Sequence, residues 1–220
     1  MASDRDLVQI VSLSLQVSGG ATVLSTFIAI PLAATIAIKR FKGRHILISV
    51  LNAMMGLPPV VVGLVVYILL SRSGPFGDAG LLYTPMAMLI AQMCLITPLV
   101  LALAIAQLDE TNNALTDFFL IYRVGNIRRM TTLIYECRYR LVTTVLAGFG
   151  RASAEVGAVM IVGGNIDNVT RVMTTTIALE SSKGRLELAV ALGIVLIAIT
   201  IVINVFIGLI KKRGERWMAI

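Results

Sequence analysis

Charge, histidine and cysteine are all scarce in this chain. Only 14% of its 220 residues are charged, and it contains one histidine and two cysteines. The single histidine, His45, lacks the partner residues that a metal site or a catalytic triad requires. No Gly-x-x-x-x-Gly-Lys-Ser/Thr sequence is present to bind ATP phosphates. We therefore expect no catalytic residue, no metal and no cofactor in this chain, which is predicted not to be an enzyme.

Hydrophobic residues, in contrast, are abundant. They make up 57% of the chain, and its mean hydropathy of +0.90 is far from that of a soluble domain. A helix needs ~20 apolar residues to cross a membrane, and five segments meet this requirement. The sequence predicts an all-α polytopic membrane protein that forms one domain over residues 1–220, with spans at about 10–38, 46–70, 81–107, 141–163 and 188–210.

Basic residues gather after the first, third and fifth predicted spans. Because cytoplasmic loops are enriched in lysine and arginine, the N-terminus is predicted to lie outside and the C-terminus in the cytoplasm. The net charge of +7 is therefore a topology signal and does not indicate a nucleic-acid partner. The three clusters are Lys39, Arg40, Lys42 and Arg44; Arg123, Arg128, Arg129, Arg138 and Arg140; and Lys211, Lys212, Arg213 and Arg216.

The segment 108–140 is the longest cytoplasmic connection in this topology. It is shorter than the ~50 residues of a small domain. Asp109 to Asn113 is typical of a helix start, and Gly125-Asn126 is typical of a helix end. A short helix carrying Phe118, Phe119 and Tyr122 can dock into a groove of a soluble partner. The alternative is that this helix lies among the lipid headgroups.

Arg151 and Glu155 lie in the middle of the fourth predicted span, among alanine and glycine residues. Charged residues at membrane depth are rare and usually functional. Their spacing of four residues places both side chains on one face of a continuous helix, where they can form an ion pair. Two interpretations remain open: the pair braces the helix bundle, or the arginine contacts an oxyanion.

The stretch that surrounds this pair, Gly150–Ile166, resembles the fourth-span region of permease subunits of ATP-binding-cassette (ABC) importers for molybdate and tungstate. The following Thr170–Glu180 looks most like the tungstate branch. The likeness extends to Leu57–Gly63 and Ser73–Gly77.

This resemblance implies a type I ABC importer permease in the cytoplasmic (inner) membrane of a prokaryote. Its expected partners are a second copy of the chain, two ATPase subunits that bind ATP-Mg, an extracytoplasmic substrate-binding protein and membrane lipid. It also implies a coupling element that docks on the ATPase, although the residues before its glycine do not read Glu-Ala-Ala. That element comprises Asp117, Phe118, Phe119, Tyr122, Arg123, Gly125 and Arg128.

The polar external segment 165–187 supplies candidates for the outer gate of the transport route: Asn165, Thr174, Thr175 and Thr176. The leading hypothesis is import of tungstate or molybdate by alternating access. The alternatives are a passive oxyanion channel, an ABC permease for another oxyanion such as sulfate, and a membrane scaffold without flux.

Overall fold

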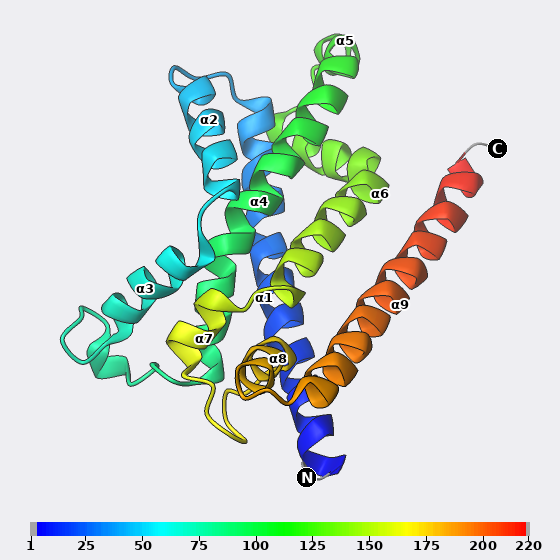
Figure 1. The fold of residues 1–220 in the computed structure, drawn as a ribbon. Helices are drawn as coiled ribbons and strands as arrows, with labels where there is room; N and C mark the ends of the chain where they lie inside the picture. Colours follow the sequence, from blue (N-terminus) through cyan, green and yellow to red (C-terminus); the bar gives the residue numbers. More distant parts are fainter. Residues whose placement is uncertain (1–3, 219–220) are drawn as a thin grey trace.

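The computed structural model describes residues 4–218, and the side chains of residues 7–209 among them. The described chain is built of α-helices with one short 3-10 turn (Figure 1). The elements are α1 (Asp4–Ile38), α2 (Arg44–Met55), α3 (Pro59–Leu70), η1 (Gly77–Ala79), α4 (Pro85–Ala114), α5 (Thr116–Ile121), α6 (Asn126–Ser153), α7 (Gly157–Gly163), α8 (Met173–Ser182) and α9 (Leu186–Met218).

Helices α1, α4 and α6 pack together at the centre of the molecule (Figure 1). Helix α1 approaches its neighbours through alanines that are fully buried: Ala21, Ala29, Ala33 and Ala34. Small side chains allow the close backbone approach on which helix association in membranes depends. The bundle is therefore held by a tight seam of small residues, and large apolar side chains remain on its surface.

Within the part of the chain that the structure describes, three helices are long and apolar enough to cross a membrane, and the number rises to five if each of two bent helix pairs is one span. The bent pairs are α2 with α3, at 100°, and α6 with α7, at 58°. The predicted spans 46–70 and 141–163 are therefore each broken near the middle. The break after α2 follows from Gly56 and the two prolines Pro58 and Pro59, since proline cannot donate the backbone hydrogen bond that would continue the helix.

The predicted cytoplasmic loop 108–140 is almost entirely helical. Residues Asp109 to Asn113 continue α4 and do not begin a new helix, so this helix-start prediction is wrong. Gly125 does not end a helix either: α5 ends at Ile121, and Gly125 directly precedes α6. Polar residues with helix-start character are here the last turn of a long helix, because buried contacts to α1 and α6 stabilise that turn.

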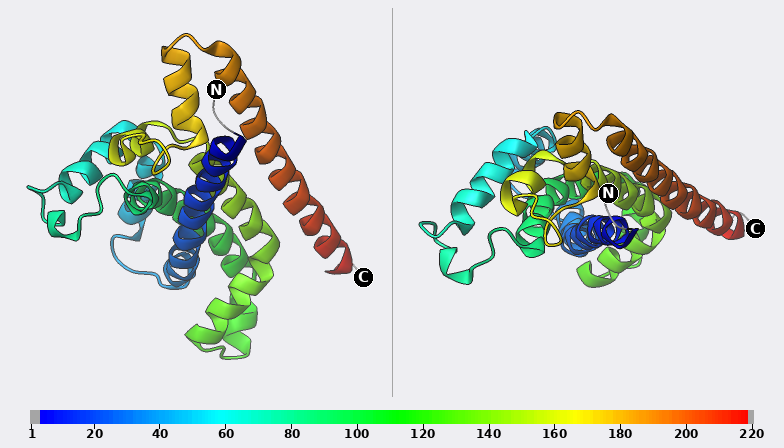
Figure 2. Two further views of the ribbon diagram at one scale, coloured as in Figure 1. Left: turned by 90° about the horizontal axis from the view of Figure 1, so that it is seen from below. Right: turned by 60° about the horizontal axis from the view of Figure 1, so that its bottom comes forward.

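The two ends of the described chain lie at opposite ends of the molecule (Figure 1). Helix α5 and the turn before α2 share one end with the C-terminal part of α9, while α8 lies at the other end beside the start of α1. Helix α9 contacts α8 and α6 and diverges from the bundle toward its C-terminal end (Figure 1 and Figure 2). Two of the basic clusters lie toward the α5 end: residues 39–44, up to the start of α2, and residues 123–140, just before and along α6.

Candidate functional site

The break between α6 and α7 lies at the charged pair that the sequence singles out. Helix α6 ends at Ser153, and α7 begins at Gly157. The Glu155 carboxylate accepts a hydrogen bond from the Ala158 backbone N–H over 3.0 Å, as a capping side chain does at the start of a helix. Glu155 is 5% exposed, and its charge is placed against the α7 amide rather than against an arginine.

The predicted ion pair between Arg151 and Glu155 does not form, and this prediction is wrong. The four-residue spacing brings two side chains together only on a continuous helix, and α6 ends between them. Arg151 lies in the last turn of α6 and is exposed. It makes no ion pair or hydrogen bond with the residues that the structure describes. The arginine is therefore available to a ligand or partner.

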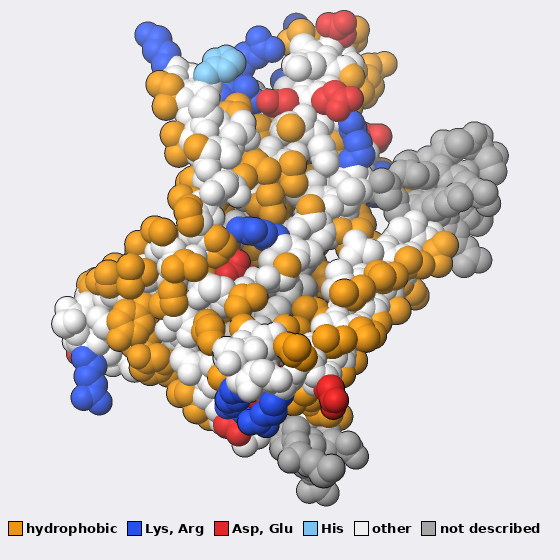
Figure 3. All heavy atoms as spheres, viewed as in Figure 1, with side chains coloured by type: hydrophobic (Ala, Val, Ile, Leu, Met, Phe, Trp, Pro, Cys, Tyr) orange, Lys and Arg blue, Asp and Glu red, His pale blue; other side chains and the backbone are white. Residues whose placement is uncertain are grey.

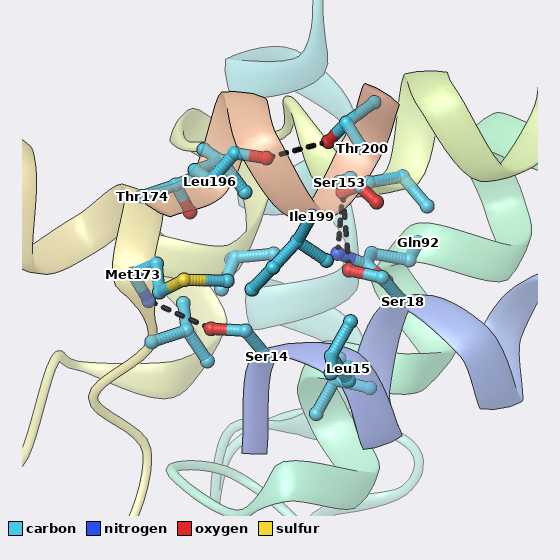
Figure 4. Close-up of a pocket in the computed structure, with 14 residues that line it drawn as sticks. Ser14, Leu15, Ser18, Gln92, Ser153, Met173, Thr174, Leu196, Ile199 and Thr200 are labelled. Atoms are coloured by element: carbon cyan, nitrogen blue, oxygen red, sulfur yellow. Dashed lines mark hydrogen bonds between the residues drawn. The ribbon is translucent and has the colours of Figure 1, made fainter. Parts of the chain in front are cut away.

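Side chains from three other helices donate to backbone carbonyls at the break, and Figure 4 shows two of these donors, Gln92 and Ser18. The Gln92 amide and the Ser18 hydroxyl donate to the Ala152 carbonyl over 3.1 and 3.4 Å. The Ala152 carbonyl also accepts the Glu155 backbone N–H over 3.2 Å. The Thr174 hydroxyl donates to the Glu155 carbonyl over 2.9 Å. An unsatisfied backbone group is costly in a membrane, so these donors from α4, α1 and α8 stabilise the bend. Reasoning from the sequence did not identify Gln92 or Ser18.

A cavity beside these donors has a volume of about 20 Å³. It lies between α1, α4, α8, α9 and the end of α6 (Figure 4). This space holds about one water molecule. The Gln92 Oε1 and Ser153 Oγ atoms are buried without a hydrogen-bond partner in the described part of the chain, which suits a bridging water. A tetrahedral oxyanion is too large for this cavity, which therefore offers it no path in this conformation.

The two broken spans contact each other next to their bends. A Cβ atom built on Gly157 would lie 2.7 Å from Val60 Cγ2, and one built on Gly63 would lie 2.7 Å from the Ala158 Cα. Neither contact leaves room for a larger residue, so glycine is required for α3 and α7 to pack. The bend at residues 56–58 and the bend at 154–156 form one junction.

The four gate candidates differ in their surroundings. The Thr175 and Thr176 side chains are buried, and their hydroxyls bond to the Val172 backbone in the first turn of α8. Thr175 caps α8, and the Thr176 hydroxyl donates to the carbonyl one turn before it, so neither hydroxyl lines a surface in this conformation. Their role at the gate stays a prediction. The Thr174 hydroxyl donates to the Glu155 carbonyl at the α6–α7 break. Asn165 is partly exposed and has a left-handed backbone at φ 50°.

Helix α5 projects from the end of the molecule that lies opposite α8 and the start of α1 (Figure 1). Six of the seven predicted coupling residues are exposed, namely Asp117, Phe118, Tyr122, Arg123, Gly125 and Arg128. The seventh, Phe119, is 3% exposed and packs against the bundle. Phe118 and Tyr122 stack with ring centroids 4.6 Å apart, so α5 presents an aromatic surface outward and uses Phe119 as its anchor.

A cation–π contact and two hydrogen bonds connect Phe119 to the helix bundle. The Arg129 guanidinium lies 4.9 Å from the Phe119 ring centroid, and its Nε donates to Asn112 Oδ1 over 2.8 Å. The Asn112 amide in turn donates to the Ala37 carbonyl at the end of α1 over 3.2 Å. Asn112 is buried and joins α4 to α1 and α6, and Arg129 extends this link to α5. The sequence showed Asn112 only as a polar residue.

Two ion pairs lie near the Phe119–Arg129–Asn112 contacts, at the same end of the molecule. Arg44 of α2 pairs with Asp109, and Arg140 of α6 pairs with Glu110 over 3.0 Å. No group of three or more histidine, cysteine or carboxylate residues able to hold a metal occurs in the described residues. The cysteines Cys94 and Cys137 are both free thiols.

Known proteins similar to this chain are membrane subunits of transporters. The tungstate uptake permease TupB of Peptoclostridium acidaminophilum is 41% identical over 96% of this chain and 92% of its own length. A probable anion ABC transporter permease of Haloferax volcanii is 38% identical over 90% of this chain and 88% of its own length.

The fold is also shared with a solved structure. A bacterial ABC transporter involved in the import of alginate, an acidic polysaccharide, has a chain that superposes with a TM-score of 0.78 at 17% identity, over 96% of this chain and 80% of that one. A scan against protein-family models finds no match. On the strength of the two sequence relatives, this chain belongs to the family of ABC transporter permeases that includes the tungstate uptake permeases.

Proposed function

We propose that the chain is the membrane subunit of an importer that carries tungstate or molybdate across the cytoplasmic membrane of a prokaryote by alternating access. The observation that carries this proposal is the 41% identity to a tungstate uptake permease over nearly the whole chain. Two ATPase subunits bind ATP-Mg and supply the energy, and an external binding protein delivers the oxyanion. Five crossings, with the N-terminus outside and the C-terminus in the cytoplasm, fit the described arrangement.

The transport route lies between two copies of the chain in this proposal. The cavity at the α6–α7 break holds about one water molecule, so this part of the bundle provides no path in this conformation. An alternating-access route also requires surfaces that separate and close, which a seam of fully buried alanines does not permit. A homodimer places the movable surface at the junction between subunits.

Coupling to the ATPase is assigned to α5. Its exposed Phe118 and Tyr122 form a compact aromatic surface that suits a groove on a soluble partner. Movement of α5 passes to the bundle through Phe119, Arg129 and Asn112, because these three contacts connect it to α6, α4 and the end of α1. ATP-driven closure of the ATPase pair then rotates the helices that form the route.

The proposed function is tested by reconstituting the chain with its ATPase and binding protein in proteoliposomes. Labelled tungstate is expected to accumulate only with ATP, and excess sulfate is expected to compete poorly. Accumulation without ATP identifies the passive channel instead, and efficient competition by sulfate identifies a sulfate permease. Absence of flux with a fully assembled complex supports the scaffold.

The role of α5 is tested with the double variant Phe118→Ala with Tyr122→Ala. Because both rings are exposed, the variant is expected to keep the thermal stability of the wild type while recovery of the ATPase on copurification falls at least about tenfold, the range of an interface hot spot. Tyr135→Ala removes an exposed ring from α6 and is the matched control. Normal ATPase recovery with the double variant would refute the docking assignment.

A further inference from the structure

Arg151 and Glu155 are the only charged residues within the five predicted spans. Figure 3 shows that charged side chains gather toward the two ends of the molecule, while apolar side chains cover much of the surface between them. Glu155 is buried and caps α7, whereas Arg151 is exposed and has no partner among the described residues. The single unneutralised charge at span depth is therefore the guanidinium of Arg151.

An unpaired arginine at this depth is costly against lipid, and such residues face a bundle interior or a water-filled cavity. Arg151 therefore marks the part of the surface that is not covered by lipid. It lies one turn before the α6–α7 bend, which contacts α3 just after the α2–α3 bend. Discontinuous helices in transporters place substrate sites near the middle of the membrane. The position of Arg151 beside a helix break and its unpaired charge therefore both indicate that it lies on the transport route.

We propose that Arg151 contacts the divalent oxyanion midway along the transport route, with one guanidinium from each copy of the chain. This proposal rests on the function and the homodimer proposed above. A guanidinium presents a rigid fork of N–H donors that matches paired oxygen atoms of an oxyanion. Two copies supply two positive charges, which equal the charge of one tungstate or molybdate ion. The anion is then neutralised where the surrounding medium solvates charge poorly.

Because Arg151 lies at the end of α6, it could also have a purely structural role: a positive charge near a helix C-terminus interacts favourably with the helix dipole. A lysine would serve that role equally well, because it supplies the charge without the fork. The comparison of Arg151→Lys with Arg151→Gln therefore separates a substrate contact from a dipole effect. Arg72→Gln removes an exposed arginine from the loop after α3 and controls for the loss of charge alone.

The experiment measures two quantities in the reconstituted complex: ATP-dependent tungstate uptake, and stimulation of the ATPase by the tungstate-loaded binding protein. Arg151→Gln is expected to lower uptake at least tenfold, and Arg151→Lys at least threefold, while ATPase stimulation stays within twofold of the wild type. Arg72→Gln is expected to leave both quantities unchanged.

Uptake by Arg151→Lys at the wild-type level would overturn the proposal, because the charge alone would then suffice. A parallel loss of uptake and of ATPase stimulation in both variants would also overturn it, since that result identifies a bracing residue. If the wild-type complex imports no oxyanion at all, the proposed function itself fails, and this outcome is distinct from the other two.

Discussion

The α5 end and the middle of the molecule differ in how their charges are paired. At the α5 end, Arg44, Arg129 and Arg140 each have a protein partner, and together they connect α2, α4, α5 and α6. At the middle, Glu155 caps a helix and Arg151 has no partner among the described residues. Paired charges in a wet region hold a structure together at low cost, whereas an unpaired charge at membrane depth persists only where it has another use.

The two regions also differ in how their helices meet. The α5 end is joined by long side chains, which can adjust to a movement. The middle is joined by a close contact of Gly63 with the Ala158 backbone and of Gly157 with the short Val60 side chain, which leave less room to adjust. A rigid junction at the bends and an adjustable connection to α5 are suited to transmitting a movement from one end of the bundle to the other.

The largest expected effect comes from adding one methyl group at the rigid junction. Gly63→Ala places a Cβ atom 2.7 Å from the Ala158 Cα, so α3 and α7 must separate. We expect a loss of about 1–3 kcal/mol in stability, measured as a lower melting temperature in detergent. Gly193→Ala on α9 meets no atom within 4 Å and is the matched control. Equal melting temperatures for the two variants would show that the junction is not rigid.

A smaller effect is expected from the buried amide at the α5 end. Asn112→Ala removes the hydrogen bonds to the Ala37 carbonyl and to Arg129, at an expected cost of about 1–3 kcal/mol. Arg129 is only partly buried and can bind water instead, which places the effect at the lower end of that range. Stimulation of the ATPase is expected to fall more than stability does, because α5 loses its link to α1. The control is Asn113→Ala, which alters an exposed neighbour.

The smallest effect is expected from the exposed ion pair. Glu110→Ala removes the partner of Arg140, but the glutamate side chain is 73% exposed. Such pairs contribute about 0–1 kcal/mol and are weakened by salt. The melting temperature is expected to change little, and the difference from wild type is expected to vanish in high salt. A loss as large as that of Asn112→Ala would mean that charge pairing, rather than the buried amide, holds this end.

Much of the fold follows from local sequence. Apolar runs indicate the long helices α1, α4 and α9, and the exposed aromatic helix α5 lies where the charge pattern and the family resemblance place the coupling element. Two boundaries were wrong for different reasons. Contacts with distant helices keep Asp109 to Asn113 within α4, whereas Gly125 is exposed and begins α6 as its N-cap, a position that glycine also favours. Buried contacts stabilise a helix more than the preference of its terminal residues does.

The sequence by itself determined that this chain belongs in a membrane and that Arg151 and Glu155 are the charged residues within its predicted spans. Only the tertiary structure decided that these two residues are not partners. Their spacing predicts a pair on a continuous helix, but α6 ends between them, and Gln92, Ser18 and Thr174 from other helices donate to carbonyls at the break. A local pattern holds no information about such distant donors.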